Sequence, residues 1–377
     1  MPFRRQRKID VSLRKITPVH GTAIAMDIKL KLSASEVSVA MDINPEAAFV
    51  LVEKCWRQVD DASYRRAQAR VAEAAEVEAI GARILALTLS GGDLGDMDDE
   101  TPDLDVERLI QDAAINSATE FAESMTLRTP KEINIAVRDY SKLLRSSKLD
   151  KAGKSNVKKQ LKSTLRRKLG KESEPSTLVA FSTVFHRTWV SCPPVVKLRS
   201  TVETFGGVKI CIVGKPDAVD EAAVVEVKNP NSEFPVGRCA VETFPLWETP
   251  WVQLHAYLQT HRTAEGYLVE HFREPQPNKE LIVFIRTSSG VVELPTYYPK
   301  DSADQGVLFV TRTTRDESNA YWGKIVRPLL RRFAWIVEMV VRDSETQLAF
   351  VRDPAGTYTK LGKSFDVARC KRFDVER

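Results

Sequence analysis

The stretch "GKPDAVDEAAVVEVKNP", residues 214–230, places three charged side chains on segments that otherwise have the composition of β-strand. Pro216 has a fixed φ and no backbone N–H, which marks the end or edge of a strand at this point. Residues 220–222 are expected to form a turn. The stretch therefore predicts a β-hairpin that brings Asp217 beside Glu226.

The second strand of this hairpin has two different faces. Glu226 and Lys228 are two residues apart and point the same way, while Val225 and Val227 point into a core. Two carboxylates suit Mg²⁺ or Mn²⁺ and leave positions for water and phosphate. Such an ion polarises a phosphoryl oxygen and lowers the pKa of a bound water. A nearby Lys can orient or deprotonate that water or neutralise transition-state charge, and the Val227 carbonyl can add a ligand.

A salt-bridged strand edge is the alternative interpretation of this pattern. Glu-x-Lys is common on solvent-facing strands, where the two charges need no further role. Here the strand "AVVEVKNP" (223–230) is apolar around the charges, and a Pro-Asp pair lies upstream at hairpin distance. These two features favour a metal site over a surface ion pair.

These residues resemble the PD-(D/E)xK nuclease superfamily in type, order and spacing. The segment "WVQLHAYLQT" (251–260), about twenty-five residues further on, makes the chain similar to the RecB-like, YqaJ and lambda-exonuclease branch. That branch carries a Gln on the helix after the Glu-x-Lys strand, often with a Tyr four residues later. Gln253 and Tyr257 fit, since residues i and i+4 share one helix face. The resemblance covers about residues 185–290.

The resemblance implies a site that binds one or two Mg²⁺ or Mn²⁺ ions. Asp217, Glu226 and the carbonyl of Val227 would bind the metal. Lys228 would act on the nucleophilic water, and Gln253 would help to position the site.

Three further residues take roles from the same resemblance. Glu203, on the strand before a Gly-Gly turn, matches an acidic position that many members use as a metal ligand. His186 lies on the preceding helix, where some RecB-like enzymes place a metal-ligating His; a lone His there is more often structural. Tyr257 is expected to contact nucleic acid. The iron–sulfur cysteines of some relatives are absent, which excludes that subgroup.

A basic segment precedes the hairpin region. Residues 142–171 contain twelve Lys or Arg and one Asp, whereas residues 91–107 contain eight acidic residues and no basic ones. A basic density of this kind indicates a polyanion partner, and the alternative is a solvated helix face. The expected nucleic-acid contacts are Lys158, Lys159, Lys162, Arg166, Arg167 and Lys168.

Other cofactors and a membrane location are disfavoured. The five cysteines are scattered without a C-x-x-C spacing, which argues against disulfides, zinc ribbons and iron–sulfur clusters. The two "GKS" segments lack a Gly at P-loop distance, so no ATP site is expected. No apolar run approaches eighteen residues, so no membrane span is expected. We expect an intracellular protein of the cytoplasm or nucleus, with the mitochondrion left open.

The predicted fold is mixed α/β: a restriction-endonuclease-like core, with a mixed central sheet flanked by helices, after a largely helical N-terminal region. The N-terminal region is expected to start with a hairpin of strands 22–33 and 35–43. In the core, helix 319–341 should kink or restart at Pro328. The expected divisions are an N-terminal region (1–140), a basic helical segment or linker (141–175), the nuclease core (176–345) and a C-terminal extension (346–377).

The function predicted from these features is metal-dependent hydrolysis of DNA phosphodiester bonds, as an exonuclease of recombination, repair or replication. A structure- or site-specific endonuclease on DNA or RNA is one alternative. A catalytically retired nucleic-acid-binding protein is another. The partner expected in every case is nucleic acid, with a homo-oligomer or a recombination or replication protein left open.

Overall fold

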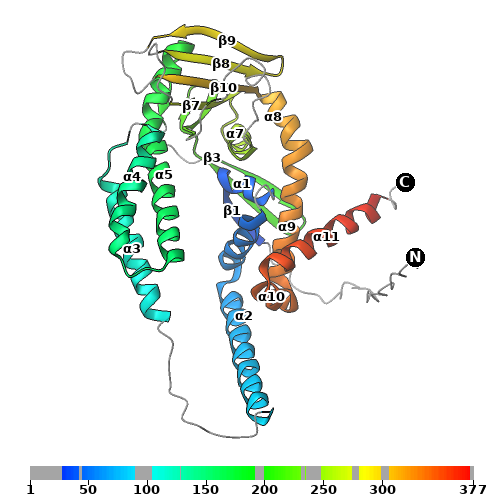
Figure 1. Cartoon of the computed structure of the whole chain (residues 1–377). Helices are drawn as coiled ribbons and strands as arrows, with labels where there is room; N and C mark the ends of the chain where they lie inside the picture. The colour runs from blue at the N-terminus through cyan, green and yellow to red at the C-terminus, as the bar shows by residue number, and fades with distance from the viewer. Residues whose placement is uncertain are drawn as a thin grey trace, which may run out of the picture.

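The computed structural model in Figure 1 is a mixed α/β protein in which helices flank a mixed central sheet. The predicted fold class and the largely helical N-terminal region are confirmed. Among the described residues, no helix is long and apolar enough to cross a membrane. The structure describes residues 28–41, 45–89, 104–127, 129–191, 199–230, 234, 248–273, 280–298 and 305–373.

The larger sheet of the described residues has seven strands in the order β2-β5-β6-β7-β10-β8-β9. Its strands are β2 (Val190–Ser191), β5 (Ala218–Val219), β6 (Ala223–Lys228), β7 (Glu265–Phe272), β8 (Leu281–Thr287), β9 (Gly290–Tyr297) and β10 (Gly306–Thr314). Strand β6 pairs in parallel with β7, and β10 runs antiparallel to β7 and parallel to β8. The sheet is therefore mixed, with β6 and β7 near its middle.

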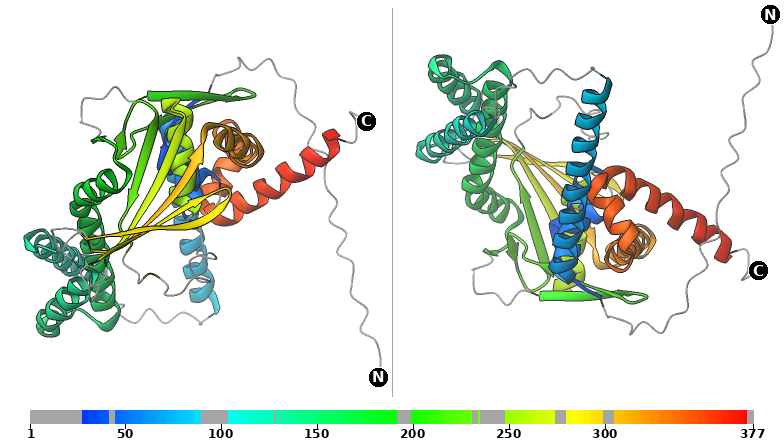
Figure 2. Two further views of the ribbon diagram at one scale, coloured as in Figure 1. Left: turned by 90° about the horizontal axis from the view of Figure 1, so that it is seen from above. Right: turned by 90° about the horizontal axis from the view of Figure 1, so that it is seen from below.

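Helices cover both faces of this sheet around β6. Val225 and Val227 pack with Phe181 of α5 (Lys151–Phe185) on one face. Val224 and Leu268 pack on the other face with α7 (Glu248–His261). Figure 2 shows these two helices on opposite sides of the sheet. The strand that carries Glu226 is thus held between two helical layers.

The smaller sheet contains β1 (Ile28–Ser33), β4 (Val208–Gly214) and β3 (Arg199–Phe205), in the order β1-β4-β3. The β3–β4 hairpin turns at Gly206, whose φ of +60° suits glycine. Strand β1 pairs in parallel with β4, so an N-terminal strand completes the sheet that leads into Asp217.

The expected second strand over residues 35–43 is wrong. Helix α1 (Ala34–Ala40) begins directly after β1. Ser33 is its N-cap, and Glu36 reaches back to the Ser33 N–H at 2.8 Å, which completes a capping box. This local signal decides the segment in favour of helix.

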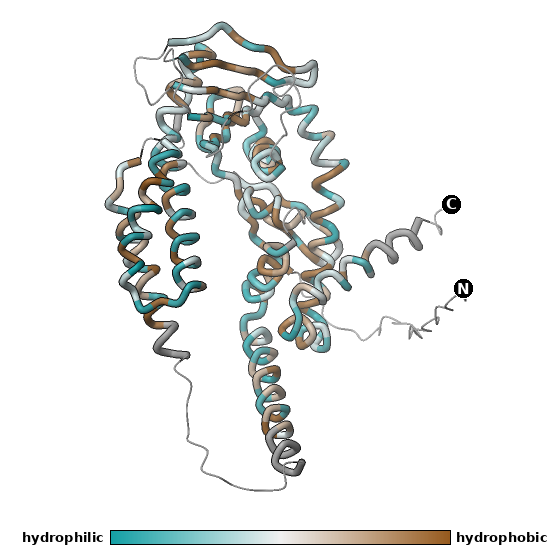
Figure 3. The backbone as a smooth tube through the Cα atoms, viewed as in Figure 1, coloured by the Kyte–Doolittle hydropathy of each residue, from teal (hydrophilic) through white to brown (hydrophobic). Residues whose placement is uncertain are grey.

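A helical arm is built from α3 (Leu104–Ser124), α4 (Pro130–Leu143) and the first half of α5. The three helices share an apolar core that includes Ile133, Leu161 and Leu165. In Figure 3 each helix of the arm carries both hydrophobic and hydrophilic stretches. Helix α5 continues without a break past Pro175 to the large sheet, so one element joins the arm to the core. The expected division near residue 175 falls inside this helix.

The remaining helices are α2 (Pro45–Leu89), α8 (Arg315–Tyr321), α9 (Arg327–Arg342), α10 (Ser344–Arg352) and α11 (Pro354–Phe373). A π-helical turn over Trp322–Val326 joins α8 to α9, and Pro328 lies in the first turn of α9. The backbone stays helical through this turn, so the helix changes its hydrogen-bond pattern just before Pro328 and does not restart there. Trp56 of α2 and Phe350 of α10 pack in the same core as α7. The N-terminal and C-terminal segments therefore share one core with the strands around the site.

Candidate functional site

The predicted hairpin is present and fixes Asp217 against β6. The Asp217 N–H donates to the Val225 carbonyl at 3.0 Å. In return, the Val227 N–H donates to Asp217 Oδ2 at 2.7 Å. The carboxylate is thus bonded to the main chain between Glu226 and Lys228.

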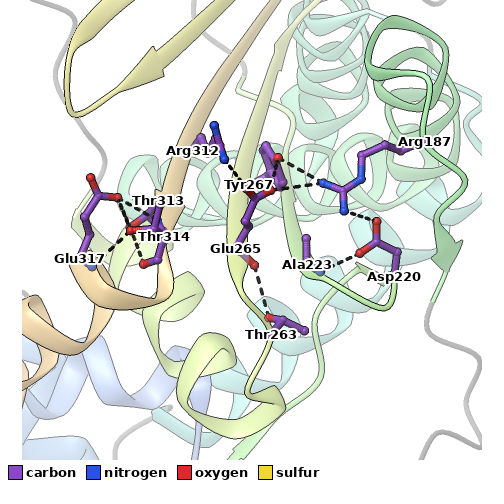
Figure 4. A network of polar contacts seen from close by, with 10 residues as sticks. All are labelled: Arg187, Asp220, Ala223, Thr263, Glu265, Tyr267, Arg312, Thr313, Thr314 and Glu317. Atoms are coloured by element: carbon purple, nitrogen blue, oxygen red, sulfur yellow. Dashed lines mark hydrogen bonds and ion pairs between the residues drawn. The ribbon is translucent and has the colours of Figure 1, made fainter.

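The turn of this hairpin is held by charged side chains. Asp220 Oδ1 accepts from the N–H groups of Ala222 at 2.8 Å and Ala223 at 2.6 Å. Its other oxygen pairs with Arg187, which also contacts Glu265 and Tyr267, as Figure 4 shows. The network joins the end of α5 to the β5–β6 turn and the start of β7. It restricts the register that places Asp217 beside Glu226.

Glu226 and Lys228 form an ion pair on the face of β6 that α7 covers. Glu226 is 1% exposed, and burial raises its pKa to about 8, with Lys228 opposing the shift. Burial alone would lower the pKa of Lys228, but Glu226, and then Asp217 and Glu174, raise it. Burial also raises the pKa of Asp217. A buried carboxylate of this kind needs a cation to stay ionised at neutral pH.

Helix α7 brings Gln253 and Tyr257 close to Glu226. Gln253 Nε2 donates to the Tyr257 hydroxyl at 2.6 Å. Burial, and then the charge of Glu226, raises the pKa of the Tyr257 phenol above its usual range. The helix approaches β4 so closely that a Cβ on Gly214 would lie 2.8 Å from Tyr257 Cδ1.

A pocket of about 390 Å³ opens beside Tyr257. Its basic lining residues are Lys31, Lys54 and Lys215, and Lys54 is paired with Glu36. Strand β4 ends at Gly214 and leads from this pocket to the hairpin that carries Asp217.

Glu174 is a further acidic residue whose charge acts on the hairpin, and sequence reasoning missed it. It lies on α5 and is half-buried, and burial first, then the charge of Asp217, raises its pKa. Lys228 acts on it in the opposite direction. The signal lay in "GKESEP" (170–175), at the end of the basic segment, but only the fold brings this helix to the hairpin.

Two residues predicted from the resemblance lie elsewhere. Glu203 is on β3, where Oε1 accepts from Trp322 Nε1 at 2.9 Å and Oε2 pairs with Arg327 at 3.1 Å. His186 is the exposed C-cap of α5, with a left-handed φ of 51°, next to Arg187 and the hairpin turn. The structure brings neither side chain to Asp217 and Glu226.

The predicted basic contacts lie on α5, whose buried stripe faces the helical arm. Lys159, Arg166 and Arg167 are exposed, and Lys158 and Lys162 are half-buried. Lys168 differs from these residues because its ammonium is bonded within the helical arm. It donates to the carbonyls of Ala122 at 3.2 Å and Glu123 at 2.5 Å, near the end of α3.

The donor set fits a hard divalent cation in part. Glu226 Oε2 is buried and has no hydrogen-bond partner in the described part of the chain, so this oxygen is left to bind a cation. Within the described residues, no group of three or more His, Cys, Asp or Glu side chains is placed so that it could hold a metal ion. An ion held here would thus keep several water or phosphate ligands, as Mg²⁺ ordinarily does.

Comparisons with known proteins found little that is similar at the sequence level. No protein-family model and no curated protein matches the chain. Two solved structures are similar, an alkaline exonuclease (LHK-Exo) from Laribacter hongkongensis and LHK-Exo in complex with dAMP. Both are 14% identical, with TM-scores of 0.31 and 0.30, covering 62% and 61% of this chain and 92% of theirs. The case for a function rests on the side chains described above.

Proposed function

We propose that this protein is a metal-dependent nuclease that hydrolyses phosphodiester bonds, with DNA as substrate and exonuclease action as the mode. The supporting observation is the joint placement of Asp217, Glu226 and Lys228, a buried acid pair with an ammonium on one hairpin. A solvated strand edge would leave these charges exposed, whereas Glu226 is 1% exposed. Burying these charges costs folding free energy, so their burial is better explained by a function than by a contribution to stability.

Each side chain has a role in this proposal. Asp217, Glu226 and the Val227 carbonyl would hold the ion, and Glu174 acts on Asp217 and Lys228 through its charge. A bound Mg²⁺ or Mn²⁺ supplies a polarised phosphoryl oxygen and a water of lowered pKa. Lys228 orients that water and balances the charge that develops on the phosphate.

Gln253 and Tyr257 keep their place beside the carboxylates through their mutual hydrogen bond. The lysines of the pocket at β4 and the basic face of α5 would contact the phosphate backbone, which makes binding dependent on salt.

The first test is cleavage of end-labelled linear double-stranded DNA with Mg²⁺ or Mn²⁺. Wild type should cleave, while Asp217→Asn, Glu226→Gln and Lys228→Met should each lose at least about a hundredfold in rate. Lys209→Met, a half-buried lysine on neighbouring β4, is the matched control and should cleave normally. EDTA should abolish cleavage. Equal rates in wild type and Lys228→Met would refute the assignment of the site.

A second assay separates exonuclease from endonuclease action. Linear DNA should be degraded from its ends while an internally labelled covalent circle stays intact; nicked circles would establish an endonuclease. If linear DNA, single strands and RNA are all bound but none is cleaved, the protein is a retired nuclease that binds nucleic acid.

A further inference from the structure

A second pocket, of about 290 Å³, is lined by residues of α7, α8 and the strands β8 and β10 and by residues next to them. Its aromatic lining is Trp251, His255 and Tyr321. His255 packs edge-on against Trp251 with ring centroids 4.5 Å apart, and stacks on Tyr321 at 4.4 Å. Trp251 and Tyr321 are half-buried, so the pocket has flat apolar walls that reach the surface.

Three residues that line this pocket have a buried polar atom without a partner in the described part of the protein: His255 Nε2, Thr311 Oγ1 and Arg312 Nε. Of these residues, His255 and Thr311 are almost fully buried, at 1% and 3% exposed. Buried polar groups are ordinarily hydrogen-bonded. The unpaired atoms of His255 and Thr311 therefore indicate a ligand that pairs with them.

The hydrogen bond of His255 leaves one edge of its ring for a ligand. Its Nδ1 lies 2.8 Å from Ser318 Oγ, which also lies 3.5 Å from Gln259 Nε2. Burial lowers the pKa of His255 to about 3, which keeps the ring neutral. The pocket thus presents one unpaired ring nitrogen and one hydroxyl between aromatic walls.

The charge at the pocket also selects its ligand. Arg286 is the register partner of Thr311 on the neighbouring strand, and its guanidinium lies 4.7 Å from the Phe309 ring centroid. Glu317 is on the other side, where its carboxylate accepts from the Thr314 N–H at 2.8 Å and so faces the start of α8 (Figure 4). A guanidinium beside an aromatic slot suits a phosphate attached to a flat base.

We propose that this pocket is a nucleotide-binding site, separate from the Asp217–Glu226 cluster, that takes one base with its phosphate. The base lies against Trp251 and Tyr321 and pairs with His255 Nε2 and Thr311 Oγ1, and Arg286 contacts the phosphate. The nucleotide is either free or an unpaired unit of a strand, since both present the same chemistry.

Calorimetric titration of the full chain in EDTA tests this without cleavage. Thymidine monophosphate should bind, and deoxyribose 5-phosphate and inorganic phosphate should bind at least about tenfold more weakly because they lack the base. Thr311→Val, a change of nearly equal volume, should weaken nucleotide binding about fivefold, and Trp251→Leu should weaken it further. Thr201→Val on β3 is the control that should leave binding unchanged.

The outcomes separate this site from the proposed nuclease function. Binding that is absent would overturn the pocket, whatever the cleavage assay gives. Binding that is unchanged by both Thr311→Val and Trp251→Leu would overturn it as well. Failure of cleavage with these binding results intact would overturn the nuclease alone. A tetrathymidylate that binds more tightly than the mononucleotide, and is weakened by Thr311→Val, would identify the strand as the source. Tighter binding of the mononucleotide would identify the free nucleotide.

Discussion

Asp217 accepts the N–H of Val227 through Oδ2 at 2.7 Å, so one carboxylate both supports the hairpin and faces the proposed metal site. Asp217→Asn retains an oxygen for this hydrogen bond but removes the charge. We therefore expect the free energy of unfolding of Asp217→Asn to lie within about 1 kcal/mol of the wild-type value. Its cleavage rate should fall at least about a hundredfold.

Asp217→Ala is the informative comparison, because it removes the hydrogen bond as well. Thermal denaturation should show a loss of about 1–3 kcal/mol relative to Asp217→Asn, since the Val227 N–H is left unpaired. Cleavage by Asp217→Asn at the wild-type rate would show that the side chain has only its structural role.

Glu174 tests whether the cluster extends to α5. Its charge interacts with Asp217 and Lys228, so Glu174→Gln should reduce the cleavage rate about 10–100-fold, the usual cost of removing a group next to a metal ligand. Glu172→Gln is the control, because Glu172 lies on the same helix but is exposed and paired with Lys168. Equal rates in the two variants would remove Glu174 from the proposed site.

The sequence predicted those parts of the fold that depend on local signals. The hairpin predicted around residues 220–222 is present as the antiparallel pair β5 and β6. Pro328 follows a π-helical turn in the last long helix of the core. Strand β10 was not predicted, although it lies between β7 and β8. Its apolar run was too short to separate a strand from a buried helix by period, and its position depends on pairings between distant segments.

The site residues also divide into those predicted by local signals and those that depend on packing between distant segments. Asp217, Glu226 and Lys228 lie within one hairpin, so their proximity follows from the strand period and the turn. Gln253 and Tyr257 also meet within one helix. Glu174 reaches the cluster only through the packing of α5 on the sheet. Glu203 matched a family position by type, but Trp322 and Arg327 engage its carboxylate on β3.

The basic face of α5 predicts a specific dependence of DNA binding on salt. Replacing the exposed Lys159, Arg166 and Arg167 by Gln should weaken binding to every DNA sequence and lower the slope of log K against log salt by about 0.9 for each phosphate that is no longer neutralised. Fluorescence anisotropy with labelled DNA in EDTA measures both. Lys168→Met should instead destabilise the helical arm, because it removes the hydrogen bonds to the α3 carbonyls. An unchanged slope in the triple variant would make this surface a solvated face.

His271 predicts how stability changes with pH. It is fully buried between the Thr177 hydroxyl and the Gln305 carbonyl, and burial, then the charge of Arg273, lowers its pKa to about 3. The unfolded chain takes up a proton below about pH 6.5 and the native chain does not, so this residue's contribution to stability is lost as pH falls. The loss is about 1.4 kcal/mol per pH unit between pH 6 and 4.

Glu270 acts in the opposite sense, since burial raises its pKa to about 7, and the two effects partly cancel in the wild type. Comparing variants isolates His271. Urea denaturation between pH 7 and 4 should show that His271→Gln, although less stable at pH 7, loses less stability on acidification than wild type. His186→Gln, at an exposed position, should keep the wild-type slope. Equal slopes in wild type and His271→Gln would mean that the buried ring is protonated in the native state, and that the contact between α5 and β7 tolerates the charge.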